Sequence, residues 1–241
     1  MKSIILAAGF ATRLYPLTKN KAKPLLEIRG KPIIDYTIEK IREITSEEII
    51  IITNNLFYHD FCLWKMKTDF KNVSIINDGV SDSSSRLGAI GDLLFVIDKL
   101  NIDEDLFAIS GDNMFDYSLK DSFNLFREKK QNLSVFYDIK NLEEAKRFGV
   151  AEINNSGIIS NFEEKPNNPQ TTLCSTSTHF FLKEIIPLMR EFCKEKHSDQ
   201  PGLFLKFLFP KIQIYAHIVK GEWIDVGTKE SLSEAIIKFG N

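Results

Sequence analysis

Small residues and two cations lie close together near the start of the chain. Residues 3–7 form an apolar run typical of a buried strand, and the turn that follows at 8–14 contains Gly9 and Arg13. A second cation, Lys23, follows further along the chain. Backbone N–H groups at the end of a strand, together with fixed positive charge, are suited to bind phosphate. The segment therefore predicts a phosphate-binding loop.

Alternating strands and helices in the first half of the chain would position this loop. Apolar and β-branched runs predict strands at residues 3–7, 48–53, 73–77, 106–110 and 133–138. Apolar residues at helical spacing predict helices at residues 32–42, 57–70, 87–100 and 119–130. This alternation is typical of a doubly wound α/β sheet, which binds ligands at the carboxyl ends of its strands. The loop after residue 7 and the segment Gly111-Asp112-Asn113 both follow predicted strands.

The second half of the chain has a different pattern, with more strands. Strands are expected at residues 150–153, 157–162, 175–182 and 212–219, and helices at 184–196, 202–209 and 229–239, with a turn-rich segment at 221–227. There is no linker, repeat or shift of composition. We therefore expect one domain over residues 1–241. Its fold would be a Rossmann-like doubly wound mixed sheet in three α/β/α layers, with a small β-rich lobe for substrate.

Composition and charge disfavour several classes of protein. A net charge of −2 over 241 residues gives no basis for binding nucleic acid or a membrane surface. No apolar run approaches the ~18 residues of a membrane span, and no secretory signal is present. The 3 cysteines are widely spaced and form no CxxC pair, which argues against disulfides and structural zinc. We expect a soluble cytoplasmic protein.

The order of several motifs resembles the sugar-phosphate nucleotidyltransferase family. The motifs are Leu6-Ala7-Ala8-Gly9-Phe10-Ala11-Thr12-Arg13-Leu14, Lys23-Pro24-Leu25-Leu26, Ser110-Gly111-Asp112-Asn113, Phe148-Gly149-Val150, Phe162-Glu163-Glu164-Lys165-Pro166 and Trp223-Ile224-Asp225-Val226-Gly227-Thr228. The resemblance runs from residue 1 to about 235 and is strongest to the short glucose-1-phosphate thymidylyltransferase type. It implies transfer of a nucleotidyl group from a nucleoside triphosphate to a sugar 1-phosphate, with release of pyrophosphate, in nucleotide-sugar biosynthesis such as that for cell-surface polysaccharide.

The resemblance also implies a role for each motif. Arg13, Lys23 and Asp112 are expected to be catalytic, and Asp112 and Asp225 to hold Mg²⁺, which needs few carboxylates when phosphate oxygens and water complete its shell. The expected nucleotide-binding residues are Leu6, Ala8, Gly9, Thr12, Arg13, Asn77 and Gly88. The expected residues for the sugar phosphate are Gly149, Glu164, Lys165, Thr176 and Ser177. Residues 1–138 would form the nucleotide-binding half and 139–241 the sugar-phosphate half.

Four positions depart from the family pattern. Ala11 stands where glycine is usual, and it would be strained if its φ angle were positive. Ala22 replaces a proline before Lys23. Ser177 also replaces a glycine, and His179 stands where tyrosine is common, so the sugar need not be glucose. We expect His179 to be a core or surface histidine rather than a catalytic one.

The segment at 77–88 leaves the nucleobase open. It lacks the Gln-x-x-x-x-Gly-Leu-Ala pattern of thymidylyl enzymes. Asn77 could contact a pyrimidine edge and Gly88 could allow close backbone approach, so dTTP, UTP and CTP are favoured, although a purine pocket stays open. The Asn-Asp pair and the polar loop are also similar to cytidylyltransferases that act on phosphocholine-like acceptors.

Other classes of function are disfavoured by the same residues. Retention of Arg13, Lys23, Asp112 and Asp225 argues against a protein that only binds nucleotide. A dinucleotide oxidoreductase would need G-x-G-x-x-G in the opening loop and an acidic residue after the second strand, and neither is present. The aromatic run at 204–209 is expected in the core. Leu205 and Phe209 would remain outside it as apolar surface, so a contact between copies of the chain in a homo-oligomer is an alternative.

Overall fold

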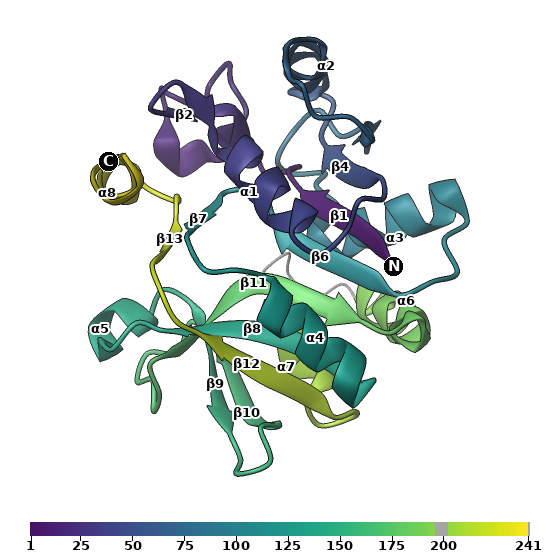
Figure 1. The fold of residues 1–241 in the computed structure, drawn as a ribbon, viewed down its shortest axis with the longest axis vertical. Helices are drawn as coiled ribbons and strands as arrows, with labels where there is room; N and C mark the ends of the chain where they lie inside the picture. The colour runs from purple at the N-terminus through teal and green to yellow at the C-terminus, as the bar shows by residue number, and fades with distance from the viewer. Residues whose placement is uncertain (196–201, 241) are drawn as a thin grey trace. The chain divides into compact units, whose positions relative to one another are not determined.

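The computed structural model describes residues 1–195 and 202–240 and divides into two compact units (Figure 1). The N-terminal unit comprises Lys2–Leu87, Ile109–Leu119 and Gly221–Asn241. The central unit comprises Met1, Gly88–Ala108 and Lys120–Lys220. Within the described ranges, no helix has the length and apolar character that a membrane crossing requires.

Three parallel strands are the framework of the N-terminal unit. They are β1 (Lys2–Leu6), β4 (Ile49–Thr53) and β5 (Val73–Asn77), with β4 pairing with both others (Figure 1). All residues of β4 are buried, as a continuous isoleucine run predicts for a strand covered on both faces. Helices α1 (Ile33–Arg42) and α2 (Tyr58–Lys67) belong to the same unit.

Short elements complete the N-terminal unit. Two one-turn 3₁₀ helices lie at η1 (Thr12–Leu14) and η2 (Lys23–Leu25). The hairpin β2 (Glu27–Ile28) and β3 (Lys31–Pro32) turns through Arg29 and Gly30, both with positive φ, as a tight two-residue turn requires. The strands β7 (Asn113–Phe115) and β13 (Trp223–Asp225) pair antiparallel. The closing helix α8 (Lys229–Phe239) begins with a capping box formed by Thr228 and Ser231.

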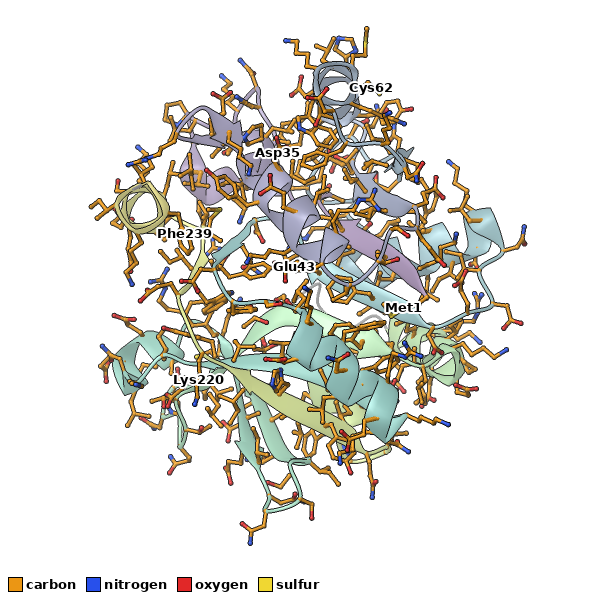
Figure 2. All side chains as sticks on the ribbon, in the orientation of Figure 1. Met1, Asp35, Glu43, Cys62, Lys220 and Phe239 are labelled. Carbon is orange, nitrogen blue, oxygen red and sulfur yellow. The ribbon has the colours of Figure 1, made fainter. Side chains whose placement is uncertain are left out.

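One apolar cluster joins these short elements. Its buried members come from the opening loop, the β2–β3 hairpin, α1, β7, β13 and α8: Leu14, Leu26, Ile28, Ile33, Met114, Ile224, Val226 and Ala235. Phe239, labelled in Figure 2, packs against the cluster from the end of α8. Glu43, also labelled there, accepts hydrogen bonds from Ser118 and from the N–H of Leu119, which ties the end of α1 to the segment after β7. The short elements therefore have a common core.

The central unit is built on five strands. In β8 (Asn132–Asp138), one edge pairs antiparallel with β11 (Leu173–Phe181) and the other pairs parallel with β12 (Ile214–Val219). Strand β9 (Gly149–Ile153) pairs antiparallel with β10 (Ile159–Glu164) and with β11. The helices are α3 (Gly88–Leu100), α4 (Lys120–Lys129), α5 (Leu142–Ala145), α6 (Ile186–Lys194), which continues the 3₁₀ turn η3 (Lys183–Ile185), and α7 (Gly202–Leu208). Along the chain, β6 (Leu106–Ser110) runs from the central unit into the N-terminal unit.

The α/β fold class with a mixed sheet is confirmed, and the long elements lie where the sequence predicts them. The elements missed are α5 and the strands β2, β3, β7 and β13, which are too short to show periodicity. The helix end expected at residue 196 lies outside the described residues. The two units have other boundaries than the expected halves: residues 88–108 and 120–138 belong to the central unit, and 221–240 to the N-terminal unit. A single domain stays a prediction.

The aromatic run of α7 is in the core of the central unit, as expected. Phe204 and Leu208 are buried, and the Phe204 ring lies 5.2 Å from that of Phe192. Leu205, which we expected to be left over, is buried as well, because α7 is covered on a wider face than its spacing suggested. Leu205 therefore no longer supports a contact between copies of the chain, and a homo-oligomer stays a prediction.

His179 of β11 is a core histidine, as expected. Its Nδ1 lies 2.9 Å from Ser134 Oγ, and its ring stacks on Phe181 with 5.3 Å between centroids. Burial of the imidazole lowers the pKa of His179 to about 4. The neutral ring is therefore part of the folded core at pH 7.

We predict that His179 makes the protein less stable in mild acid. The imidazole of His179 binds a proton near pH 6.5 in the unfolded chain but only near pH 4 in the folded chain. The free energy of unfolding is therefore highest above pH 6.5 and falls by at most about 3 kcal/mol as the pH drops from 6.5 to 4. Unfolding in urea from pH 8 to pH 4 should show a shallower decline for His179→Leu. The pKa of His217 is lowered by burial too, so some decline should remain. Equal slopes for both proteins would contradict the prediction.

Candidate active site

The opening loop of the N-terminal unit is held through its carbonyl groups. Asn54 donates its side-chain amide to the Ala8 carbonyl at 2.9 Å, and Thr18 donates its hydroxyl to the Ala11 carbonyl at 2.7 Å. Among the described residues, the backbone N–H groups from Gly9 to Arg13 have no acceptor, and Gly9, Thr12 and Arg13 are exposed. A fixed loop with free N–H donors has the chemistry of a phosphate cradle. Leu6 is the last residue of β1 and Ala8 is buried in the turn after it, and their binding of nucleotide stays a prediction.

Ala11 has the left-handed backbone conformation that its family position suggested. Its φ and ψ angles are 47° and 39°, in the region that favours glycine. The conformation turns the chain into η1, where the Leu14 N–H donates to the Ala11 carbonyl at 3.0 Å. Ala11 is therefore a strained alanine at the position where the family pattern has glycine.

Lys23 lies between two aspartates from distant parts of the chain. Its ammonium forms an ion pair with Asp112, and Nζ lies 3.9 Å from Asp225 Oδ1. The side chains of Lys23, Asp112 and Asp225 are 12%, 21% and 30% exposed. Ser110 donates its hydroxyl to the other carboxylate oxygen of Asp112 at 2.5 Å. The structure thus brings together three of the residues expected from the family resemblance.

The β7–β13 ladder explains how the two aspartates meet. Asp225 is paired with Asn113, the residue after Asp112, and the Val226 N–H donates to the Asp112 carbonyl at 3.1 Å. Gly111 lets this turn approach β1: a Cβ there would lie 2.9 Å from Ile5 Cγ2, which is too close. The absence of a side chain at 111 is therefore a packing requirement.

Arg13 completes the same group of charges. A Cβ on Gly227 would lie 3.6 Å from Arg13 Nη2 and 3.2 Å from Asp225 Oδ2, so the guanidinium and this carboxylate border one glycine. The Gly227 N–H donates to the Asp225 carbonyl at 2.8 Å and is close to Ser231 Oγ at 3.0 Å. The start of α8 thus fixes the segment that carries Asp225.

The charges in this group stabilise one another. Burial alone would lower the pKa of Lys23, but the carboxylates of Asp112 and Asp225 outweigh it and raise that pKa. Burial alone would raise the pKa of Asp112, and the Lys23 ammonium together with the Ser110 hydroxyl holds it below its usual range. Both groups are therefore charged at neutral pH.

The donor set fits Mg²⁺ with substrate oxygens. In the part of the chain that the structure describes, no three acidic, histidine or cysteine side chains form a metal-binding group. Asp112 and Asp225 do share a single cation, the ammonium of Lys23. Mg²⁺ commonly takes one or two carboxylates and fills its shell with water and substrate phosphates. Mg²⁺ binding by these two aspartates stays a prediction.

Asn77, expected to contact the base, is used within its own loop. Its Nδ2 donates to Asn55 Oδ1 at 2.8 Å, and its Oδ1 accepts from the Gly79 N–H at 2.8 Å. Because a side-chain amide has two N–H donors and two acceptor lone pairs, these two bonds restrict the orientation of Asn77 and leave one donor and one lone pair for a further partner. Gly88 begins α3 in the central unit with a φ of 77°, so its backbone needs glycine. The base-binding roles of both residues stay predictions.

Glu164 and Lys165 lie at the end of β10 in the central unit, where β10 pairs Glu164 with Gly149. The Glu164 side chain is only 6% exposed, and its Oε1 lies 3.8 Å from the ammonium of Lys165. Burial raises the pKa of Glu164, while Lys165 opposes the shift. Lys165 has a φ of 48° and donates its N–H to the Phe148 carbonyl at 3.0 Å. A buried carboxylate beside an exposed ammonium suits a hydroxylated phosphate ester.

Thr176 and Ser177 lie in a bulge of β11 against β8, between Ser175 and His179. Thr176 is buried and donates its hydroxyl to the Val135 carbonyl at 3.0 Å. A bound sugar phosphate would therefore contact the backbone of Thr176 rather than its hydroxyl. Ser177 has a φ of 54°, which again keeps a glycine-type conformation where glycine is usual. Our sequence reasoning missed Gly202, which borders Glu164; a glycine at the start of a predicted helix was the available signal.

Comparison with known proteins identifies the family of this chain. The profile of the family described as Nucleotidyl transferase matches residues 2–240. The chain belongs to this family. The resemblance drawn from the motifs is therefore confirmed, and the two groups of residues above can be compared with those of other nucleotidyltransferases.

Two curated relatives are named for the transfer of different nucleotides. The chain is 30% identical to glucose-1-phosphate adenylyltransferase of Clostridium novyi (strain NT), over 98% of this chain and 65% of that protein. It is 27% identical to mannose-1-phosphate guanylyltransferase 1 of Arabidopsis thaliana, over 94% of this chain and 61% of that protein. The chain thus spans slightly less than two thirds of the length of these relatives.

Solved structures share the fold over nearly the whole chain. A Bacillus anthracis protein provisionally assigned as a glucose-1-phosphate thymidylyltransferase, in complex with a sucrose, has a TM-score of 0.78 at 26% identity, covering 98% of this chain and 94% of that one. A UDP-glucose pyrophosphorylase complexed with UDP-glucose has a TM-score of 0.80 at 22% identity, covering 99% and 98%, and is similar in fold.

We predict that Ala11→Gly stabilises the protein. An alanine in the left-handed conformation costs roughly 1–2 kcal/mol, which the substitution removes. Glycine also gives the unfolded chain more freedom, which destabilises the folded protein by about 0.4–1 kcal/mol. The net gain should be about 0.5–1 kcal/mol, measured by urea unfolding. Ala8→Gly is the matched control, because Ala8 has no positive φ and its replacement should destabilise. A loss of stability in Ala11→Gly would contradict the prediction.

We predict that Lys23→Met destabilises the protein in the absence of divalent cations. It leaves Asp112 and Asp225 without their shared cation, at a cost of about 1–3 kcal/mol after allowing for partial exposure. Thermal unfolding should show a lower Tm in EDTA and a larger gain on adding MgCl₂ than wild type shows. Lys21→Met, which removes an exposed ion pair with Glu27, should change little. An unchanged Tm in EDTA, or no extra gain from Mg²⁺, would be contrary to the expectation.

Proposed function

We propose that this protein transfers a nucleotidyl group from a nucleoside triphosphate to a sugar 1-phosphate, giving a nucleotide sugar and pyrophosphate. One observation carries the proposal: Lys23, Asp112 and Asp225 converge in the N-terminal unit of a chain that belongs to the nucleotidyltransferase family. The named relatives transfer adenylyl or guanylyl groups to sugar 1-phosphates, which supports the same reaction class here.

The chemistry needs positioning and charge neutralisation more than a strong base. An oxygen of the sugar phosphate forms a bond to the α-phosphorus, while the bond from that phosphorus to the α–β bridging oxygen breaks. The electron pair of the broken bond leaves with pyrophosphate. Because the attacking oxygen is already anionic near neutral pH, no proton has to be removed from it. Fixed donors and cations at the reacting phosphates then lower the barrier.

The N-terminal unit offers these donors. The free N–H groups of residues 9–13 and the Arg13 guanidinium would bind the triphosphate. The Lys23 ammonium can exchange carboxylate oxygens for phosphate oxygens, because both are anionic acceptors. Bound at Asp112 and Asp225, Mg²⁺ would supply further positive charge at the phosphate oxygens. Lys23 thus has a different partner in the free protein from the one it needs in the reaction.

The central unit offers groups for the acceptor. The Glu164 carboxylate would accept hydrogen bonds from hydroxyls, and the exposed Lys165 ammonium would attract the phosphate of the same molecule. Gly149 would allow its backbone to approach a hydroxyl. These contacts favour an acceptor that carries both hydroxyls and phosphate, as a sugar 1-phosphate does.

The nucleotide and acceptor are a narrower part of the proposal. We favour dTTP, UTP or CTP, because Asn77 suits a pyrimidine edge, although the two curated relatives are named as an adenylyltransferase and a guanylyltransferase. A second candidate is a cytidylyltransferase that uses a phosphocholine-like acceptor, favoured by the Asn77-Asp78 pair and the polar loop after it. A screen must therefore cover all common nucleotides and both acceptor classes.

We predict magnesium-dependent release of pyrophosphate when a nucleoside triphosphate and its acceptor are both present. Purified protein would be tested with each common triphosphate against sugar 1-phosphates and phosphocholine-like acceptors. Asp112→Asn should lower kcat roughly 100-fold, because an anion at the reacting centre is lost. Asp103→Asn, at an exposed surface position, should leave kcat unchanged. Absence of release by wild type across the panel would refute the proposed activity, and full activity of Asp112→Asn would refute the assigned role.

A further inference from the structure

The carboxylate of Glu164 lies in a niche bordered by two glycines. A Cβ on Gly202, the first residue of α7, would lie 1.7 Å from Glu164 Oε2 and 2.8 Å from its Cδ. A Cβ on Gly149 would lie 2.6 Å from the same oxygen. The Phe162 ring closes the niche, with Cε1 3.1 Å from either position. Any side chain at 202 would therefore occupy the space of the carboxylate.

Gly202 is not required by the backbone. It is absent from the residues with positive φ, so its conformation is one that alanine also adopts. At a position whose backbone suits alanine, replacing glycine by alanine stabilises a protein by about 0.4–1 kcal/mol, because the unfolded chain loses freedom. A glycine without a conformational reason is explained by the space that it leaves, and here that space is filled by Glu164.

The niche also fixes how Glu164 meets other groups. The side chain is 6% exposed, and the ammonium of Lys165 lies at 3.8 Å, beyond hydrogen-bond distance from Oε1. A carboxylate held by packing in this way keeps lone pairs for a ligand that donates hydrogen bonds. Its direction is set by the glycines and the Phe162 ring around it, because they determine which rotamer fits.

We propose that Gly202 is a positioning residue for the acceptor: it leaves the space that holds the Glu164 carboxylate in the direction in which it accepts hydrogen bonds from hydroxyls of a sugar phosphate. This inference rests on the proposed function and adds a residue to it. Gly202 itself touches no substrate; it acts through Glu164.

The test is a double-mutant cycle of Gly202→Ala and Glu164→Ala. The four proteins would be compared by the KM for the acceptor found in the screen, the KM for the triphosphate, and Tm. In the wild-type background, Gly202→Ala should raise the acceptor KM about 10-fold, similar to Glu164→Ala, and leave the triphosphate KM within about twofold. In the Glu164→Ala background, where the space is free, Gly202→Ala should leave the acceptor KM unchanged and raise Tm.

Each result decides for or against the inference. Equal increases of acceptor KM in both backgrounds, or equal changes of both KM values, would overturn it, because Gly202 would then act independently of Glu164. If Gly202→Ala alone does not fold, a folded double variant with the acceptor KM of Glu164→Ala supports the niche, and an unfolded double variant overturns it. No transfer by wild type would overturn the proposed function and the inference together, whereas transfer by wild type with additive variants overturns the inference alone.

Discussion

The N-terminal unit depends on one balance of charge, that of Lys23 with Asp112 and Asp225. Removing partly buried charges from water is costly, and the cost is offset only when opposite charges meet in good geometry. The geometry here requires three separate stretches of chain: the η2 turn with Lys23, the turn between β6 and β7, and strand β13. The apolar cluster beneath them holds these stretches together. Folding of this unit and assembly of its charged group are thus one process.

Both units use glycine to place a carboxylate. Gly227 lies against Asp225, and Gly149 and Gly202 lie against Glu164. In each case the missing side chain leaves space for the carboxylate and restricts its position. The opposite solution is seen at Ala11 and Ser177, where residues with side chains adopt a glycine-type backbone. The left-handed backbone at Ala11 and at Ser177 is therefore formed at a cost in strain.

The sequence predicts the long elements well, because they depend on local patterns, and phosphate binding by the opening loop stays a prediction. Strands β7 and β13 could not be predicted, since each has only three residues and their pairing is stabilised when Met114 and Ile224 pack in the apolar cluster with residues from distant parts of the chain. The family resemblance paired Asp112 with Asp225, but it could not show that Lys23 lies between them. The contact of Gly202 with Glu164 depends on how α7 packs on β10, which leaves no trace in the spacing of either residue.

The path of the chain between the units has a consequence for biosynthesis. The chain enters the N-terminal unit at residue 2, leaves it at residue 88 and returns for residues 109–119. The unit is completed only after residue 221, when β13 and α8 are made. On the ribosome, β7 and Asp112 therefore emerge a whole unit before their partners. Until then Met114 lacks the apolar cover of Ile224 and Val226, and Lys23 lacks its second carboxylate partner, Asp225. The charged group can thus be assembled only after β13 has been made, and a nascent chain that stops before β13 carries the loop but lacks Asp225.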